Sequence, residues 1–166
     1  FRLDVQSDAA ITFIDRNHDK LFFFYLSYFG PHIPLEAIEK YLSRFPGEMP
    51  ERRRHALAML SAIDDGVGRV KETLQKYSID ENTIIFFISD KRATLRITKE
   101  DKHMPQIKRC WDGSLNDPYV GEKGMLSEGG IRVPFIVSWP NVLPKGLVYD
   151  KPVSSLDVAA TSVALA

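Results

Sequence analysis

The sequence has 166 residues, with 22 basic and 22 acidic side chains and therefore no net charge at pH 7. This balance provides no general attraction for nucleic acids or anionic membranes, so neither is expected as a partner. The single cysteine, Cys110, excludes a disulfide within the chain, and no apolar run has the length of a membrane-spanning helix. A chain of this length can bury one core, and a single domain is expected.

The first elements expected are a helix and a buried strand. Ser7 or Asp8 can cap a helix over residues 9–16, where apolar residues recur on one face. Residues 21–28 form a dense apolar run without polar alternation, which is typical of a strand buried on both faces in a parallel sheet. Prolines on either side of His32 then restrict the backbone and hold this histidine just after the strand.

A long helix is predicted for the middle of the chain. After a short helix over residues 35–45, residues 51–77 carry apolar side chains at every third or fourth position. These side chains are Leu57, Leu60, Ile63, Val67, Val70 and Leu74. Asp64 and Asp65 are adjacent acids, but neighbouring residues on a helix point in different directions. They are therefore expected to be solvated or hydrogen-bonded rather than to share a metal ion.

The second half of the chain predicts two more strands and a final helix. The apolar run at residues 83–89 places Asp90 at the C-terminal end of a strand, where open α/β sheets hold their ligands. Residues 91–119 are polar and aperiodic, as in a functional or flexible connection, and residues 111–114 predict an ordered turn within it. A strand over residues 133–138 and a helix over residues 157–166, capped near Ser155, complete the chain.

The alternation of helices and strands predicts an α/β fold. Its strands, over residues 22–28, 83–89 and 133–138, are expected to lie in one mostly parallel sheet flanked by helices. An all-β fold is excluded by the long helix.

The loop before the last strand carries four glycines, Lys123 and Glu128. Glycines let a backbone turn tightly and approach a ligand, and a lysine among them can meet an anion as a point charge. With His32 and Asp90, Lys123 forms a set that suits the hydrolysis of an anionic ester. The lysine would neutralise charge, the histidine would donate a hydrogen bond or a proton, and the carboxylate would hold a cation. Taken singly, each could instead cap a strand or turn, or be solvated.

Several segments, in order, resemble the sulfatase family of the alkaline-phosphatase-like superfamily. GEKGMLSEGGIRVPF resembles the lysine-bearing segment of that family, and FFFYLSYFGPHIP resembles its strand followed by Pro-His-x-Pro. Residues 54–68 resemble the end of its long helix, and NTIIFFISD resembles its strand ending in Ser-Asp-Asn-Gly. The final residues, VSSLDVAATSVALA, resemble the helix that follows. The resemblance covers nearly the whole chain.

The resemblance implies roles for three residues. His32 and Lys123 would line the sulfate pocket as catalytic and substrate-binding residues, and Asp90 would ligate a calcium ion. Lys91 stands where the family has an asparagine, and a lysine offers only donors and a positive charge. Either the metal site is damaged, or the lysine charge replaces part of the role of the metal.

The nucleophile of the family, a formylglycine made from cysteine or serine, has no matching motif here. Cys110 is followed by Trp-Asp-Gly-Ser, which does not fit. Residues 1–166 are therefore expected to be a partial sulfatase-like catalytic domain whose nucleophile-bearing region precedes Phe1. Without it, the chain alone is expected to be inactive, and to self-associate through apolar surface left uncovered. Because Lys91 places a positive charge beside Asp90, and one carboxylate cannot supply the six to eight oxygens that calcium usually takes, no bound calcium is expected in this chain.

The intact parent is expected to hydrolyse the sulfate ester of a carbohydrate or an aryl alcohol. By resemblance, its compartment would be periplasmic, secreted or lysosomal. Two alternatives remain open: a phosphoester or phosphonate hydrolase of the same superfamily, and a degenerate sulfatase-like protein without catalytic activity.

Overall fold

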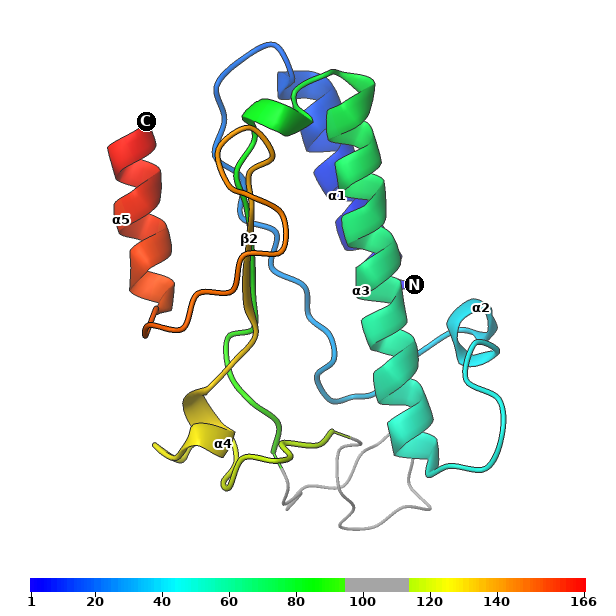
Figure 1. The fold of residues 1–166 in the computed structure, drawn as a ribbon. Coiled ribbons are helices and arrows are strands. Elements are labelled where there is room, and N and C mark those ends of the chain that lie inside the picture. The colour runs from blue at the N-terminus through cyan, green and yellow to red at the C-terminus, as the bar shows by residue number, and fades with distance from the viewer. Residues whose placement is uncertain (95–113) are drawn as a thin grey trace.

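Two helices pack along each other, and a pair of strands lies beside them (Figure 1). The computed structural model describes residues 1–94 and 114–166. The helical part contains α1 (Arg2–Asn17), α2 (Glu39–Leu42) and α3 (Glu51–Lys76). The remainder contains the 3₁₀ helix η1 (Asp80–Asn82), the strands β1 (Ile85–Ile88) and β2 (Phe135–Ser138), and the helices α4 (Glu128–Ile131) and α5 (Ser155–Leu165). In the view of Figure 1, the strand pair lies between α5 and the α1–α3 pair.

The hydrophobic core lies between α1 and α3. One face of α1 is buried at intervals of three or four residues, through Leu3, Ser7, Ala10 and Ile14. The opposing face of α3 is rich in alanine and glycine, which let the two helix backbones approach closely. The buried apolar residues and the buried glycine of α3 are Ala56, Ala58, Met59, Ala62, Ile63, Gly66 and Leu74.

The long predicted helix is confirmed, but its buried face is only partly the predicted one. Ile63 and Leu74 are buried, whereas Leu60 is 45% exposed. The predicted face followed the largest apolar side chains. The observed face is rotated toward the small residues, because these allow α1 to pack against the helix.

The first helix begins at Arg2 rather than at residue 9, so the predicted cap is wrong. Ser7 is buried inside the helix, where its hydroxyl donates to the Leu3 carbonyl (3.0 Å) and pairs with the Tyr28 hydroxyl (2.9 Å). Ser7 therefore does not cap the helix, but links α1 by a hydrogen bond to Tyr28 in the segment that follows the helix. The short helix predicted over residues 35–45 is present only as α2.

Two of the three predicted strands are confirmed, and they pair antiparallel. Ile85 lies opposite Ser138, and Ile88 lies opposite Phe135. The expectation of a mostly parallel sheet is therefore wrong for the residues described, which contain one two-stranded sheet. Apolar runs predict strands that are buried, but they do not fix the direction in which two strands pair.

The third predicted strand, over residues 22–28, is a segment without ladder hydrogen bonds, packed along α1. The ring of Phe13 on α1 stacks on Phe24, with ring centroids 4.5 Å apart, and Gln6 donates to the Ser27 carbonyl (2.6 Å). A strand requires a partner strand, and α1 provides side chains instead. Several residues of the segment remain exposed, including Leu21 and Tyr25.

The final helix matches its prediction closely, with Ser154 as its N-cap. The Ser154 hydroxyl accepts from the Leu156 amide (3.3 Å), and the Ser154 amide donates to Asp157 (2.6 Å). This reciprocal pair is a capping box. No residue of α5 is buried, and Leu156 and Val163 are each 80% exposed. Apolar surface is therefore uncovered here, and self-association through it stays a prediction.

The α1–α3 contact predicts different effects for two glycines of the same helix. A Cβ at Gly66 would overlap the hydroxyls of Ser7 and Tyr28, whereas a Cβ at Gly68 would meet nothing within 4 Å. Both alanine variants gain the same helix propensity, so the difference between them isolates packing. In urea denaturation of the whole protein, we expect Gly66→Ala to be less stable than Gly68→Ala by about 1–3 kcal/mol. Equal stabilities would contradict this packing.

Candidate active site

Two loops meet at one end of the strand pair and carry three of the predicted residues. Asp90 and Lys91 follow β1, and Lys123 precedes β2. Because the strands are antiparallel, the end of β1 lies beside the start of β2. Backbone hydrogen bonds join the loops: the Lys123 amide donates to the Ala93 carbonyl (3.0 Å), and the Arg92 amide donates to the Gly130 carbonyl (3.4 Å).

Asp90 and Lys91 form an ion pair at the surface. The Lys91 ammonium donates to Asp90 Oδ2 across 2.7 Å, and the two side chains are 40% and 75% exposed. The pKa of Lys91 is raised above its usual value, mainly because of this bond, and the Lys123 side chain lies close to that of Lys91. The two ammonium groups and the carboxylate therefore lie in one cluster.

The glycines of the Lys123 loop are required by its backbone. Gly121 and Gly124 have φ values of +107° and +93°, which L side chains rarely adopt. Gly129 and Gly130 are buried against the carbonyl oxygens of the same loop, where a Cβ would overlap backbone atoms. The sequence predicted tight turns here, but it did not predict the short helix α4 that Gly129 and Gly130 form part of.

His32 lies in the bend between Pro31 and Pro34 and is exposed. Its Nδ1 lies 2.7 Å from the Ile33 carbonyl oxygen and donates to it, because a carbonyl oxygen can only accept a hydrogen bond. The His32 ring contacts Phe29 edge-on, with ring centroids 5.6 Å apart. The hydrogen bond from Nδ1 leaves Nε2 as the nitrogen available to another group. The contacts of His32 within the described residues are local, and they do not join it to Lys123 or Asp90.

The adjacent acids of α3 behave as predicted. Both oxygens of Asp65 accept from the Arg44 guanidinium, at 2.7 and 2.8 Å, and Asp64 is exposed. The hydrogen bonds from Arg44 lower the pKa of Asp65. Asp65 is therefore part of a surface ion pair between α3 and the segment after α2.

The described residues do not fit a calcium ion by themselves. Residues 1–94 and 114–166 contain no group of three or more His, Cys, Asp or Glu side chains placed to hold a metal. Asp90 contributes one carboxylate, whereas calcium usually takes six to eight oxygen ligands. The Lys91 ammonium already contacts that carboxylate.

Sequence reasoning missed Asn116, which is 3% exposed and lies between the two loops. It also missed Tyr119, whose ring has the guanidinium groups of Arg92 and Arg132 at 4.7 and 4.8 Å from its centroid. These residues lie in a polar stretch without periodicity, so no pattern marked them. The predicted turn at residues 111–114 begins outside the described residues, and Cys110 lies there too.

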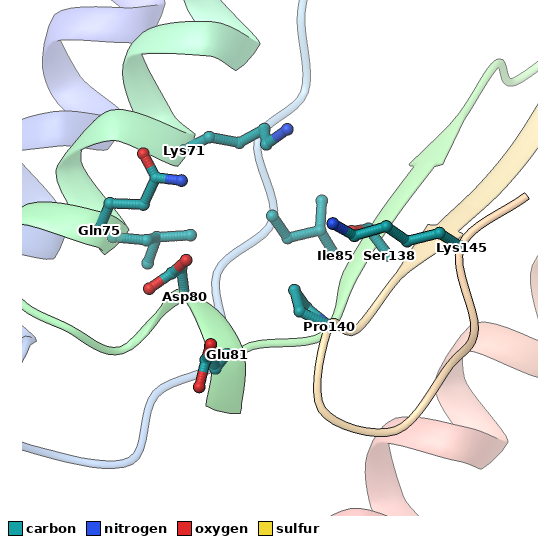
Figure 2. Close-up of a pocket in the computed structure, with 9 residues that line it drawn as sticks. Lys71, Gln75, Asp80, Glu81, Ile85, Ser138, Pro140 and Lys145 are labelled. Carbon is teal, nitrogen blue, oxygen red and sulfur yellow. The ribbon is translucent and has the colours of Figure 1, made fainter.

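A separate cavity of about 320 Å³ opens at the other end of the strand pair. Figure 2 shows Lys71 and Gln75 of α3 across from Lys145, with Asp80 and Glu81 of η1 beside them. Ile85 and Ser138 line it, and these residues pair at the ladder end opposite to Ile88 and Phe135. The cavity is therefore not part of the Asp90–Lys91–Lys123 cluster.

A family model described as Sulfatase matches residues 4–166. An arylsulfatase of Hemicentrotus pulcherrimus is 31% identical over 159 residues, which cover 96% of this chain and 25% of the relative. An N-acetylgalactosamine-6-sulfatase of Canis lupus familiaris is 33% identical over 164 residues, which cover 98% of this chain and 28% of the relative. The chain thus spans about a quarter of the length of these curated relatives.

Solved structures agree with this match. The crystal structure of Ps i-CgsB in complex with k-i-k-neocarrahexaose is 35% identical with a TM-score of 0.85, over 98% of this chain and 33% of that one. The putative sulfatase yidJ from Bacteroides fragilis has a TM-score of 0.58 at 21% identity, over 85% of this chain and 31% of that one, and shares the fold. None of the helices within residues 1–94 and 114–166 is long and apolar enough to cross a membrane. The match over residues 4–166, together with relatives above 30% identity, shows that the chain belongs to the sulfatase family.

Proposed function

We propose that the whole protein hydrolyses sulfate esters, with residues 1–166 supplying the Lys123 and His32 side of the sulfate pocket and Asp90 beside it. The observation that carries this proposal is the joining of the Lys123 loop to the segment after β1. It gathers ammonium groups and a carboxylate at one end of the strands in a chain of the sulfatase family.

The chemistry of these side chains suits a sulfate ester. The Lys123 ammonium would stabilise negative charge on the sulfuryl oxygens and on the leaving oxygen as the ester bond breaks. His32 already donates through Nδ1 to the Ile33 carbonyl, so Nε2 would face the substrate and, when protonated, donate to it. Both side chains are exposed and can be reached by a ligand.

The nucleophile would come from outside residues 1–166, because no Cys/Ser-x-Pro/Ala-x-Arg motif occurs in the sequence. A formylglycine in that part of the protein would supply the nucleophile for the sulfate ester. The sulfate pocket would thus have two sides. Another part of the protein would provide the nucleophile, and residues 1–166 would provide the groups that neutralise negative charge.

The names of the relatives support a carbohydrate or aryl sulfate as the substrate class. One similar structure holds a neocarrahexaose, and two curated relatives are named as an arylsulfatase and an N-acetylgalactosamine-6-sulfatase. The family resemblance further suggests a periplasmic, secreted or lysosomal compartment for the whole protein.

The proposal is tested by incubating the whole protein with an aryl sulfate and with sulfated oligosaccharides and measuring inorganic sulfate. We expect release from at least one of them. The presence of formylglycine is checked by peptide mass spectrometry in the same preparation. No release by a folded protein that carries the modified nucleophile would contradict the proposal.

The ion pair between Lys91 and Asp90 predicts weak calcium binding in the whole protein. The Lys91 ammonium contacts the Asp90 carboxylate, so a divalent cation would have to displace or face a positive charge. The exposed ion pair itself contributes little stability. Calorimetry with calcium is expected to give at least about tenfold tighter binding for Lys91→Asn than for the wild type, or a 1.4 kcal/mol difference. Lys20→Asn, at an exposed lysine after α1, is the control. Micromolar binding by the wild type would overturn this prediction.

A further inference from the structure

Asn116 connects the two loops of the candidate site through three hydrogen bonds. Its Nδ2 donates to the Ala93 carbonyl (3.0 Å) and to the Gly121 carbonyl (2.9 Å), and its Oδ1 accepts from the Ala93 amide (3.2 Å). The residue is 3% exposed. Both hydrogens of the amide are therefore used, together with one lone pair of its oxygen.

The backbone atoms of Ala93 and Gly121 that bond to Asn116 are close in sequence to the charged residues of the candidate site. Gly121 precedes Lys123 by two positions, and Ala93 follows Lys91 by two. The Ala93 carbonyl also accepts from the Lys123 amide, so one peptide unit receives bonds from both Asn116 and the lysine loop. A single buried side chain thus holds the backbone of the two loops at a fixed separation.

A second set of contacts holds the same junction. The Arg92 guanidinium donates to the Asn116 carbonyl (3.4 Å) and to the Arg132 carbonyl, and it lies over the Tyr119 ring. The Tyr119 amide in turn donates to the Asn116 carbonyl (2.9 Å). These contacts fix the backbone of Asn116 itself, so that its side chain is aimed at the gap between the loops.

We propose that Asn116 is a positioning residue for the sulfate site, which sets the place of the Lys123 ammonium relative to Asp90 and Lys91. The inference rests on the proposed function, because it assigns to Asn116 an effect that passes through Lys123. The amide is specifically suited to this role. An aspartate has no hydrogen to offer and would turn its charge toward the Ala93 and Gly121 carbonyl oxygens.

The test is a double-mutant cycle in the whole protein with an aryl sulfate as substrate. Asn116→Asp is expected to lower kcat/KM by about 10²-fold, the order of loss that a displacement of about 1 Å can cause. Asn141→Asp, at an exposed asparagine after β2, is the matched control and is expected to leave kcat/KM unchanged. Residual turnover of the weakest variants is measured over long incubations.

Non-additivity with Lys123→Ala separates positioning from a general structural role. If Asn116 acts by placing Lys123, Asn116→Asp should cost little further activity once the lysine is gone. An equal loss with and without Lys123, or no loss from Asn116→Asp in the protein that retains Lys123, would overturn the inference. If Asn116→Asp does not fold, Asn116→Ser, which keeps one donor, enters the same cycle with the same criteria.

Failure of the proposed function gives a different result. If Lys123→Ala itself keeps wild-type activity on the sulfate ester, the assignment of the sulfate pocket is wrong, and the inference falls with it. If Lys123→Ala is impaired but Asn116→Asp is not, the proposed function stands and the inference alone is wrong.

Discussion

Replacing Lys123 by alanine in the whole protein is expected to lower kcat for a sulfate ester by about 10²- to 10³-fold, as removal of a group that stabilises developing charge does in other hydrolases. The lysine is exposed in a loop whose backbone is held by a bond to the Ala93 carbonyl. Its ammonium would meet the sulfuryl oxygens, where negative charge increases in the transition state. Steady-state kinetics with an aryl sulfate measure the effect.

Lys145→Ala is the matched control for this variant. Lys145 is also exposed but lines the cavity at the other end of the strands. Its loss is expected to leave kcat unchanged. A change smaller than roughly threefold in Lys123→Ala, equivalent to less than about 0.65 kcal/mol, would show that this lysine does not contact the reacting group.

The second large effect is expected at Gly130. The residue is buried, and a Cβ there would overlap the carbonyl oxygens of Met125 and Glu122, which are backbone atoms of the same turn. The turn would have to open, and the bond from the Arg92 amide to the Gly130 carbonyl would be strained. We expect Gly130→Ala to lower kcat/KM by about 10²-fold through displacement of Lys123.

Gly68→Ala on α3 is the control for Gly130→Ala, because a Cβ there meets nothing within 4 Å. The folded state of both variants is compared by circular dichroism and thermal unfolding. Wild-type kcat/KM in a folded Gly130→Ala variant would show that the geometry of the turn does not matter for the reaction.

The elements that the sequence predicted well are those specified by local pattern. The long helix has its apolar period within its own residues, and β1 and β2 are short runs of β-branched and aromatic side chains. Residues 21–28 have a similar composition but form no ladder, because a strand depends on neighbours that composition does not identify. The direction of the β1–β2 pair depends in the same way on contacts far apart in the sequence.

The candidate site was predictable in part for the same reason. The sequence placed Asp90 just after one strand and Lys123 in the loop before another, and antiparallel pairing is what brings these two segments together. Asn116 was not predictable, since its partners are backbone atoms of Ala93 and Gly121 and leave no pattern of side chains. The roles of His32 and Lys123 stay predictions.

The most direct test of the sulfatase assignment compares kcat/KM of the whole protein for 4-nitrophenyl sulfate and 4-nitrophenyl phosphate. The two esters share a leaving group and differ in the anion that the Lys123 side of the pocket would hold. A higher kcat/KM for the sulfate ester, by at least about tenfold or 1.4 kcal/mol, is the predicted result. A higher value for the phosphate ester would contradict the assignment and favour a phosphoester hydrolase of the same superfamily.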